Sequence, residues 1–170
     1  MKIYLYISLF VIIGLIMGFL LGRNSNITAS NEDKIFIEQM IPHHEEAVRM
    51  AKQELGNGQS AELKDLSNNI ITAQTKEINQ MKDWYKKWYG IDYPIKSTMM
   101  PEDKDLGSLS NRDLDKKFVA SMIMHHQSAI SMAKIIEQST RRPELKKIAR
   151  NIINSQQDEI TRMERIQNIF

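Results

Sequence analysis

The four histidines of this 170-residue chain form two adjacent pairs, His43–His44 and His125–His126. Imidazole nitrogens bind copper, zinc and iron, act as general bases, and also serve as structural hydrogen-bonding groups. The chain contains no cysteine and eleven methionines. The lack of thiols excludes zinc fingers, iron–sulfur centres and disulfide-stapled folds, and it leaves methionine thioethers as the only sulfur ligands.

Each histidine pair belongs to a segment that occurs twice in the chain, so that His43 corresponds to His125 and His44 to His126. Residues 36–55 read FIEQMIPHHEEAVRMAKQEL and residues 118–137 read FVASMIMHHQSAISMAKIIE, with nine identities in 20 positions. Residues 62–84 and 144–166 match at the same offset, with ten identities in 23 positions. The constant offset predicts two copies of one helical hairpin and a pseudo-twofold structure.

Apolar residues recur at steps of three and four in all of these segments, which is the pattern of amphipathic helices. The predicted helices lie near 31–56, 60–89, 111–140 and 143–169. Short turns join the helices within each repeat, and a long connection joins the repeats. We therefore predict an all-α four-helix bundle over 32–170, with repeats at 32–90 and 111–170. Pro42 lies inside the first helix and should kink it and free the carbonyl of Glu38.

On a helical wheel, both histidines of each repeat fall on the stripe that faces the interior of the bundle. Methionines share this stripe, and glutamine, glutamate and methionine occupy the facing stripe of the second helix. Polar groups at interior positions are informative because such positions are usually apolar. The set comprises Met40, His43, His44, Met50, Gln74, Glu77 and Met81 in the first repeat, and Met122, His125, His126, Met132, Gln156, Glu159 and Met163 in the second.

This combination of side chains favours copper over other metals. Thioether sulfur is a soft ligand that selects Cu(I), with Ag(I) as its chemical mimic, and imidazole also suits copper. Zinc has little use for methionine, and di-iron bundles use about four carboxylates with a Glu-x-x-His spacing that is absent here. Met99 and Met100, in the long connection, are further candidate thioethers.

Two alternatives to copper binding stay open at this point. One is a di-metal oxidase or ferroxidase that uses Glu77 and Glu159 together with the histidines. The other is a structural or sensory bundle without metal, in which the same glutamates hold the histidines by hydrogen bonds. The chain shows no nucleophile paired with a base and no phosphate-binding glycine loop, so we expect a binding protein rather than an enzyme. Interspersed charges with a net charge of +2 argue against a nucleic-acid partner.

The segment at 1–23 is distinct from the bundle, because positions 3–21 form an uninterrupted run without a charged side chain. Such a helix spans roughly 28 Å, about the thickness of the hydrocarbon core of a membrane. We predict a transmembrane signal anchor or signal peptide at 1–23 and a polar linker at 24–31. An uncleaved anchor is favoured because the apolar run is long and only a weak cleavage motif follows it at 27–29.

The repeated motifs MIPHHEEAVRMA and MIMHHQSAISMA, each followed by Gln-x-x-Glu-Ile-x-x-Met, resemble the domain-of-unknown-function 305 family, which includes CopM-like copper-binding proteins of the bacterial cell envelope. The resemblance covers about 33–169 and implies a ferritin-like bundle with an export or anchor segment. One departure is Glu45-Glu46, where a neutral glutamine is usual, as at Gln127.

The resemblance also implies copper or silver binding through histidine and methionine. Carried over residue by residue, it points to the four histidines and to Met40, Met50, Met122 and Met132, with Met81 and Met163 as additions. We therefore expect a copper-homeostasis protein that sequesters Cu(I) or transfers it to a copper-handling protein. It would be anchored in the membrane with its domain on the periplasmic side, or secreted to the periplasm after signal cleavage. Self-association into a homo-oligomer stays open.

Overall fold

The structure is a computed structural model that describes residues 31–94 and 109–169. Its elements, in chain order, are α2 (Asn31–Asn57), α3 (Ala61–Tyr89), α4 (Asn111–Ser139) and α5 (Pro143–Gln167). Each helix begins and ends within two residues of its predicted bounds, and the described residues form no β-strand. The prediction of an all-α four-helix architecture is confirmed.

The predicted membrane segment at 1–23 lies outside the described residues, as do Met99 and Met100. Over the part of the chain that the structure describes, no helix has the length and apolar character needed to cross a membrane.

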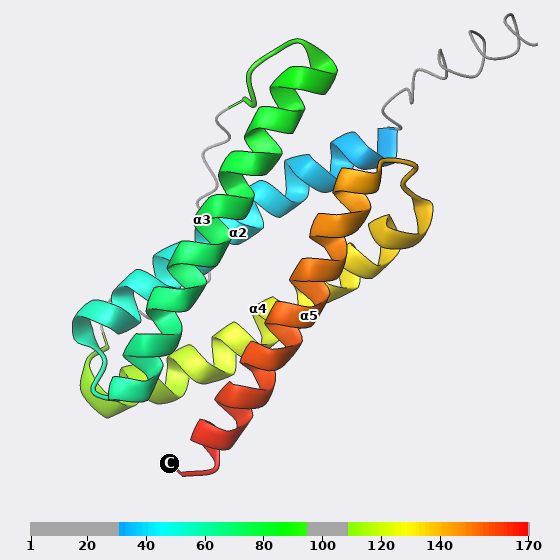
Figure 1. Cartoon of the computed structure of the whole chain (residues 1–170). Helices are drawn as coiled ribbons and strands as arrows, with labels where there is room; N and C mark the ends of the chain where they lie inside the picture. Colours follow the sequence, from blue (N-terminus) through cyan, green and yellow to red (C-terminus); the bar gives the residue numbers. More distant parts are fainter. Residues whose placement is uncertain (1–30, 95–108, 170) are drawn as a thin grey trace, which may run out of the picture.

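The two repeats form two antiparallel hairpins, α2 with α3 and α4 with α5 (Figure 1). The hairpins associate through α2 and α4, which pack against each other in one layer. The second layer contains α3 and α5, which make few contacts with each other. The first helix of each repeat, which carries the histidine pair, is therefore the one that meets its counterpart in the other repeat.

The helix ends follow from local sequence. Ser60 caps α3 by accepting a hydrogen bond from the backbone N–H of Leu63, at 3.3 Å. Gly90 ends α3 in the left-handed region, with φ of 74°, and its N–H bonds to the carbonyl of Lys86. Pro143 begins α5, where its missing N–H leaves no hydrogen bond unmade. These local signals fix where α3 begins and ends and where α5 begins.

Pro42 lies within α2, which continues as one helix through it. The proline lacks an N–H, so the carbonyl of Glu38 has no helical partner. The hydroxyl of Tyr93 donates to this carbonyl at 3.4 Å, and the hydroxyl of Tyr85 donates to the Glu38 carboxylate at 2.6 Å. The predicted free carbonyl of Glu38 therefore binds a residue that follows α3, and the Glu38 carboxylate binds the end of α3 itself.

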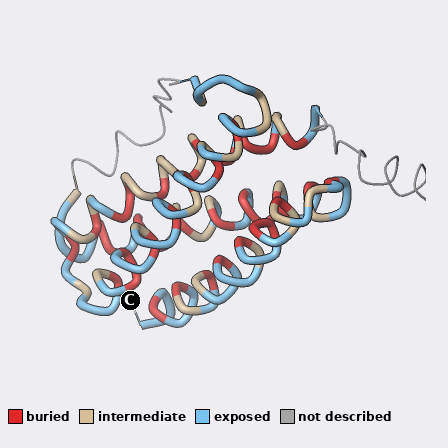
Figure 2. Tube along the Cα trace, turned by 45° about the horizontal axis from the view of Figure 1, so that its top comes forward, coloured by how far each residue is buried: buried red, intermediate tan, exposed pale blue. Residues whose placement is uncertain are grey.

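Buried residues line the inner faces of the helices (Figure 2) and divide into two hydrophobic clusters. One cluster combines the first half of α2 with the second half of α4, and the other combines the second half of α2 with the first half of α4. The histidine pairs at 43–44 and 125–126 lie between these two clusters on both helices. The polar centre of the bundle is thus enclosed by apolar packing at each end.

Two equivalent aspartates connect each hairpin to the turn of the other. Asp115, in the first turns of α4, accepts hydrogen bonds from the backbone N–H groups of Gln59 and Ser60, at 2.7 and 3.0 Å. Asp33, its equivalent in α2, lies 3.4 Å from the guanidinium of Arg142 in the α4–α5 turn. Both aspartates are almost fully buried. They set the relative position of the hairpins, and hence of the two histidine pairs.

Candidate metal centre

The two repeats bring their histidines to one place. The rings of His43 and His125 are in contact across the α2–α4 interface, with centroids 3.7 Å apart and planes inclined at 43°. Each of these rings has its neighbour in the chain at a comparable distance, 6.5 Å to His44 and 6.4 Å to His126. The histidines therefore form a single cluster rather than two separate sites.

The inner members of the cluster, His44 and His126, are fully buried and bonded to carboxylates from the other layer. The Nε2 atom of His44 lies 2.9 Å from Glu77 of α3, and that of His126 lies 2.7 Å from Glu159 of α5. A carboxylate only accepts, so the imidazole donates through Nε2–H, and in the neutral ring the Nδ1 atom then carries a lone pair. A carboxylate–histidine pair of this kind orients imidazole ligands in metal sites.

Ring nitrogens without partners are the most informative feature of the cluster. The Nδ1 atoms of all four histidines are buried and, within the described residues, have no hydrogen-bond partner. His125 also lacks a partner at Nε2. Buried polar atoms are nearly always satisfied in folded proteins, and unsatisfied ones indicate strain, catalysis or an ion that would bind there. Lone pairs gathered in this way suit a cation.

The two outer histidines, His43 and His125, have pKa values that keep their nitrogen lone pairs available. Burial, reinforced by His44 and His126, lowers the pKa of His43 to about 3. Burial, reinforced by His43, His126 and His44, lowers the pKa of His125 to about 2. Both imidazoles are therefore neutral at physiological pH, and a metal ion would not have to displace a proton from them.

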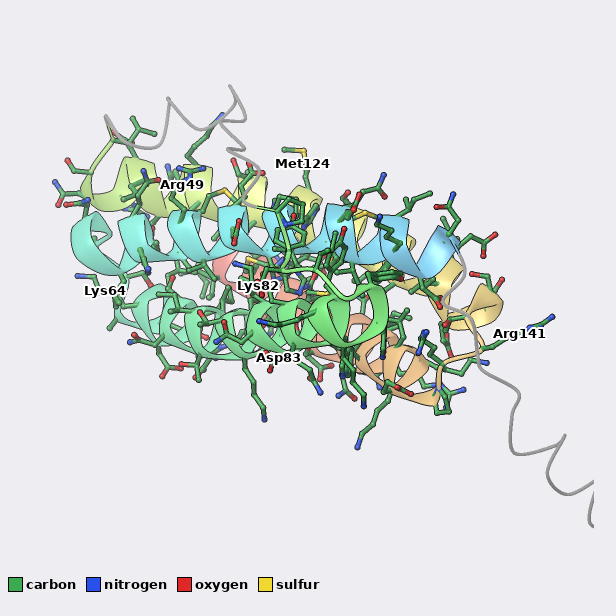
Figure 3. The ribbon with its side chains drawn as sticks, turned by 90° about the horizontal axis from the view of Figure 1, so that it is seen from above. Arg49, Lys64, Lys82, Asp83, Met124 and Arg141 are labelled. Carbon is green, nitrogen blue, oxygen red and sulfur yellow. The ribbon has the colours of Figure 1, made fainter. Side chains whose placement is uncertain are left out.

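The six predicted methionines flank the histidine cluster in two equivalent sets, one in each hydrophobic cluster. Each set draws on both repeats, and five of the six side chains are buried while Met132 is partly buried. The sets are Met40, Met81 and Met132 in one cluster, and Met50, Met122 and Met163 in the other. A seventh methionine, Met124, is 64% exposed and points away from the bundle (Figure 3). The fold thus brings imidazoles and thioethers of both repeats into one interior.

The remaining predicted residues, Gln74 and Gln156, are buried on α3 and α5. Both amide atoms of Gln74 and the amide oxygen of Gln156 have no hydrogen-bond partner in the described part of the chain. Within residues 31–94 and 109–169, no three His, Asp or Glu side chains converge as a preformed metal site. Glu77 and Glu159 are each engaged by the histidine of their own repeat. Thioethers or water would therefore have to complete any coordination at the cluster.

One carboxylate near the cluster was not predicted. Glu46 lies 3.9 Å from Nε2 of His125, measured from its Oε2 atom, and joins the α2 side of the site to α4. The only sequence signal for it is the departure from glutamine at 45–46. The adjacent Glu45 is instead bonded to Lys82 at 2.7 Å on the surface.

The layer of α3 and α5 has an opening on one side of the centre. A cavity of about 450 Å³ between these helices is lined by Glu77, Trp84 and Lys147, among others. On the other side, Arg162 of α5 reaches across to Asp65 of α3 at 2.9 Å. The residue equivalent to Arg162 in the first repeat is a glutamine, so the repeats have diverged where they border solvent.

The first helices of the two repeated hairpins bring the paired imidazoles together. The chain is therefore a four-helix bundle whose interior is lined by histidines and methionines. The chain belongs to the family described as domain of unknown function DUF305, whose model matches residues 33–167. The fold is similar to that of CopM in its Cu(I)-bound form, with 41% identity, a TM-score of 0.74, and coverage of 81% of this chain and 97% of CopM.

Other similar proteins extend this comparison. CopM in its Cu(II)-bound form is 38% identical, with a TM-score of 0.72 and coverage of 81% of this chain and 98% of CopM. A DUF305 fragment from Deinococcus radiodurans is 25% identical, with a TM-score of 0.71 and coverage of 83% of this chain and 98% of the fragment. The uncharacterised protein L153 of Acanthamoeba polyphaga mimivirus is 46% identical over 52 residues, which are 31% of this chain and 34% of that protein. The fold is therefore shared with CopM and with the DUF305 fragment from Deinococcus radiodurans.

Proposed function

We propose that this protein binds copper as Cu(I), with Ag(I) as a mimic, and that it sequesters the ion or hands it to another copper-handling protein. The observation that carries the proposal is the cluster of four imidazoles from both repeats, whose Nδ1 atoms are buried and have no hydrogen-bond partner among the described residues. Thioethers on either side of the cluster supply soft ligands. Imidazole and thioether together match the ligand preference of Cu(I).

Two groups of residues would have different roles in copper binding. The four histidines and the six interior methionines are the candidate ligands, and Glu77 and Glu159 would orient the inner histidines. Neutral imidazoles and thioethers bind without losing a proton, which allows uptake and release at constant pH. Structures of CopM with Cu(I), Cu(II) and silver support the proposal, because the fold of this chain is similar to that of CopM. No covalent step is involved.

We also propose that the domain works outside the cytoplasm. The support is the uncharged run at 3–21, which is long enough to anchor the protein in a membrane. The domain would then lie on the periplasmic side, and cleavage of the segment would instead release it into the periplasm. Labelling of the full chain in intact cells with a membrane-impermeant reagent tests the orientation, and labelling only after lysis would contradict it.

Titration with Cu(I) against a competing coloured chelator tests the copper proposal. Wild-type protein should take Cu(I) from the chelator, and a variant with alanine at all four histidines should lose this ability. Replacing Met81 and Met163 with leucine removes two thioethers at nearly constant volume and should weaken binding with little loss of stability. Met124→Leu is the matched control, because that thioether is exposed. Uptake that is absent, or unchanged in the histidine variant, would overturn the proposal.

A structural bundle without metal is the second candidate, and the direct bonds from His44 to Glu77 and from His126 to Glu159 favour it. Thermal unfolding separates the two candidates. An ion that binds only the folded state at a concentration 100 times its Kd stabilises that state by about 2.7 kcal/mol. A melting temperature that does not respond to Ag(I) would support the structural role and contradict copper binding.

A further inference from the structure

The cavity of about 450 Å³ between α3 and α5 is lined by none of the proposed copper ligands. Its volume falls within the range of about 300–1,000 Å³ that is typical of small-molecule sites. Trp84 of α3 and Ile148 of α5 give the cavity an apolar surface, and Lys76 and Lys147, one from each helix, give it two positive charges. An apolar surface beside a few charged groups is the composition expected of a ligand site.

The two lysines of the cavity are not neutralised by direct contact with the protein. Over the part of the chain that the structure describes, no ion pair joins Lys76 or Lys147 to a carboxylate. Glu77 also lines the cavity, but its carboxylate is bonded to His44 at 2.9 Å. Ammonium groups without a carboxylate partner can bind an anion through charge-assisted hydrogen bonds.

The internal repeat contains a second version of this surface, in which the two helices are joined directly. The counterpart of Gln80 is Arg162, which reaches from α5 to Asp65 at 2.9 Å and to Glu62 at 3.6 Å on α3. Asp65 is itself the counterpart of Lys147. The cation and the acid that join the helices on that side are therefore replaced at the cavity by a glutamine and a lysine.

The charges that line the cavity are reversed relative to this second version. Lys76 corresponds to Asp158 and Lys147 corresponds to Asp65, so two acidic positions have become basic. Because like charges repel, the two lysines cannot join α3 to α5 as Arg162 and Asp65 do on the other side. An anion placed between the lysines would be attracted to both of them and would join the two helices.

We propose that the cavity between α3 and α5 binds a small organic anion that has one carboxylate or phosphate group and a flat apolar body. The charged group would lie between Lys76 and Lys147, and the apolar body would lie against Trp84. Glu144 also lines the cavity, as its counterpart Glu62 does on the other side, so the walls are not uniformly positive. A ligand with a single anionic group therefore suits these walls better than a polyanion.

Fluorescence titration of the metal-free full chain with 2-naphthoate and with 2-naphthyl phosphate tests the proposal. The chain has two tryptophans, so the variant Trp88→Phe leaves Trp84 as the only one. At least one of the two anions should quench the emission of Trp84 in a saturable manner, with a Kd below about 1 mM. The uncharged 2-naphthamide should bind about tenfold more weakly, because it lacks the charge-assisted hydrogen bonds. Comparison of the two anions distinguishes a carboxylate site from a phosphate site.

The other half of the molecule supplies the variant that should close the cavity. Gln80→Arg combined with Lys147→Asp reproduces the pair that Arg162 and Asp65 form on the other side. The new arginine and aspartate should join α5 to α3 and occupy the space of the ligand. The affinity for the anion should fall by about tenfold or more.

Two single variants separate the charge of the cavity from its shape. Lys76→Gln keeps the cavity open but removes one of its positive charges, so it should also lower the affinity for the anion by about tenfold. Lys116→Gln is the matched control, because it makes the same change in net charge at an exposed position of α4 that does not line the cavity. The control should leave the affinity unchanged.

Three results would overturn the inference. They are the absence of saturable quenching by both anions, equal binding of 2-naphthamide and the anions, and wild-type affinity in the variant that combines Gln80→Arg with Lys147→Asp. Circular dichroism of each variant verifies that it is folded. No metal takes part in these titrations, so their failure would leave the proposed function intact. Failure of the protein to bind Ag(I) would in turn overturn the proposed function and leave this inference intact.

Discussion

Lowering the pH from 7.5 to 5 should not weaken the binding of Ag(I) through protonation of His43 or His125. An imidazole with the ordinary pKa of 6.5 is about 90% neutral at pH 7.5 and about 3% neutral at pH 5, a loss of about 30-fold. Two such ligands would weaken binding about 1,000-fold. The pKa of His43 is lowered to about 3 and that of His125 to about 2, so both rings stay neutral between pH 7.5 and 5. Protonation of these two rings should therefore cause no loss of Ag(I) affinity over this range.

Isothermal titration calorimetry at pH 7.5, 6 and 5 in a non-coordinating buffer measures this effect. A peptide of residues 40–51 is the control, because its two histidines are exposed to solvent and titrate normally. The peptide should lose affinity by about 30-fold for each histidine that binds. A comparable loss in the protein, at a pH where circular dichroism shows it to be folded, would refute the assignment of neutral buried imidazoles.

The same shifts predict that the metal-free protein is destabilised by acid. The pKa values of His43 and His125 are lower in the folded state than in the unfolded state, so below pH 6.5 only the unfolded chain gains protons at these rings. Stability is therefore complete above pH 6.5 and decreases as the pH falls towards 3. Together, these two rings should lower the free energy of unfolding at pH 5 by up to about 4 kcal/mol. Urea unfolding at pH 7.5 and 5 measures the difference, which should shrink when both histidines are replaced with alanine.

Three further predictions concern the bundle. Gly58→Ala should destabilise the protein by about 1–3 kcal/mol, because a Cβ atom would collide with the carboxylate and the backbone carbonyl of Glu54, whereas Gly56→Ala, with no atom within 4 Å, should be neutral or stabilising in thermal melts. Burial beside Asp115 raises the pKa of Glu54 to about 8. The unfolded chain therefore ionises this carboxyl at a lower pH than the folded protein does, so stability should decrease as the pH rises from 4.5 to 8. Urea unfolding of the Glu54→Gln variant should show no such decrease. Tyr93→Phe removes the hydrogen bond to the carbonyl freed by Pro42 and should cost about 0.5–1.5 kcal/mol in the same unfolding experiment. An unchanged free energy of unfolding in Gly58→Ala or Tyr93→Phe, or a pH dependence that persists in Glu54→Gln, would contradict the corresponding contact.

The elements of the fold were predictable because the repeat supplied each helix twice. Apolar spacing, the glycines and the proline between helices placed every helix end within two residues. Pro42 predicted the free carbonyl of Glu38, since the missing N–H is a covalent property of the residue. Interior placement of His44 and His126 also followed from the wheel, because these positions share a face with alanine and methionine.

The geometry of the site could not be predicted in the same way. The contact between His43 and His125 depends on the angle and offset at which the two hairpins pack, and no pattern within one helix encodes them. Asp33 and Glu54 were missed although both fall on the interior stripe of α2, at whole-heptad steps before and after Met40. The wheel could have found these two residues, whereas the approach of Glu46 to His125 required the assembled bundle.

X-ray absorption spectroscopy of the Cu(I)-loaded protein identifies the atoms that are bound to copper. We expect sulfur and nitrogen neighbours together, with Cu–S distances of about 2.3 Å and Cu–N distances of about 2.0 Å, by analogy with other metal–thiolate and metal–imidazole bonds. The sulfur contribution should decrease when Met81 and Met163 are replaced with leucine. A spectrum with only nitrogen and oxygen neighbours, unchanged in that variant, would contradict a copper centre built from the histidines and methionines of both repeats.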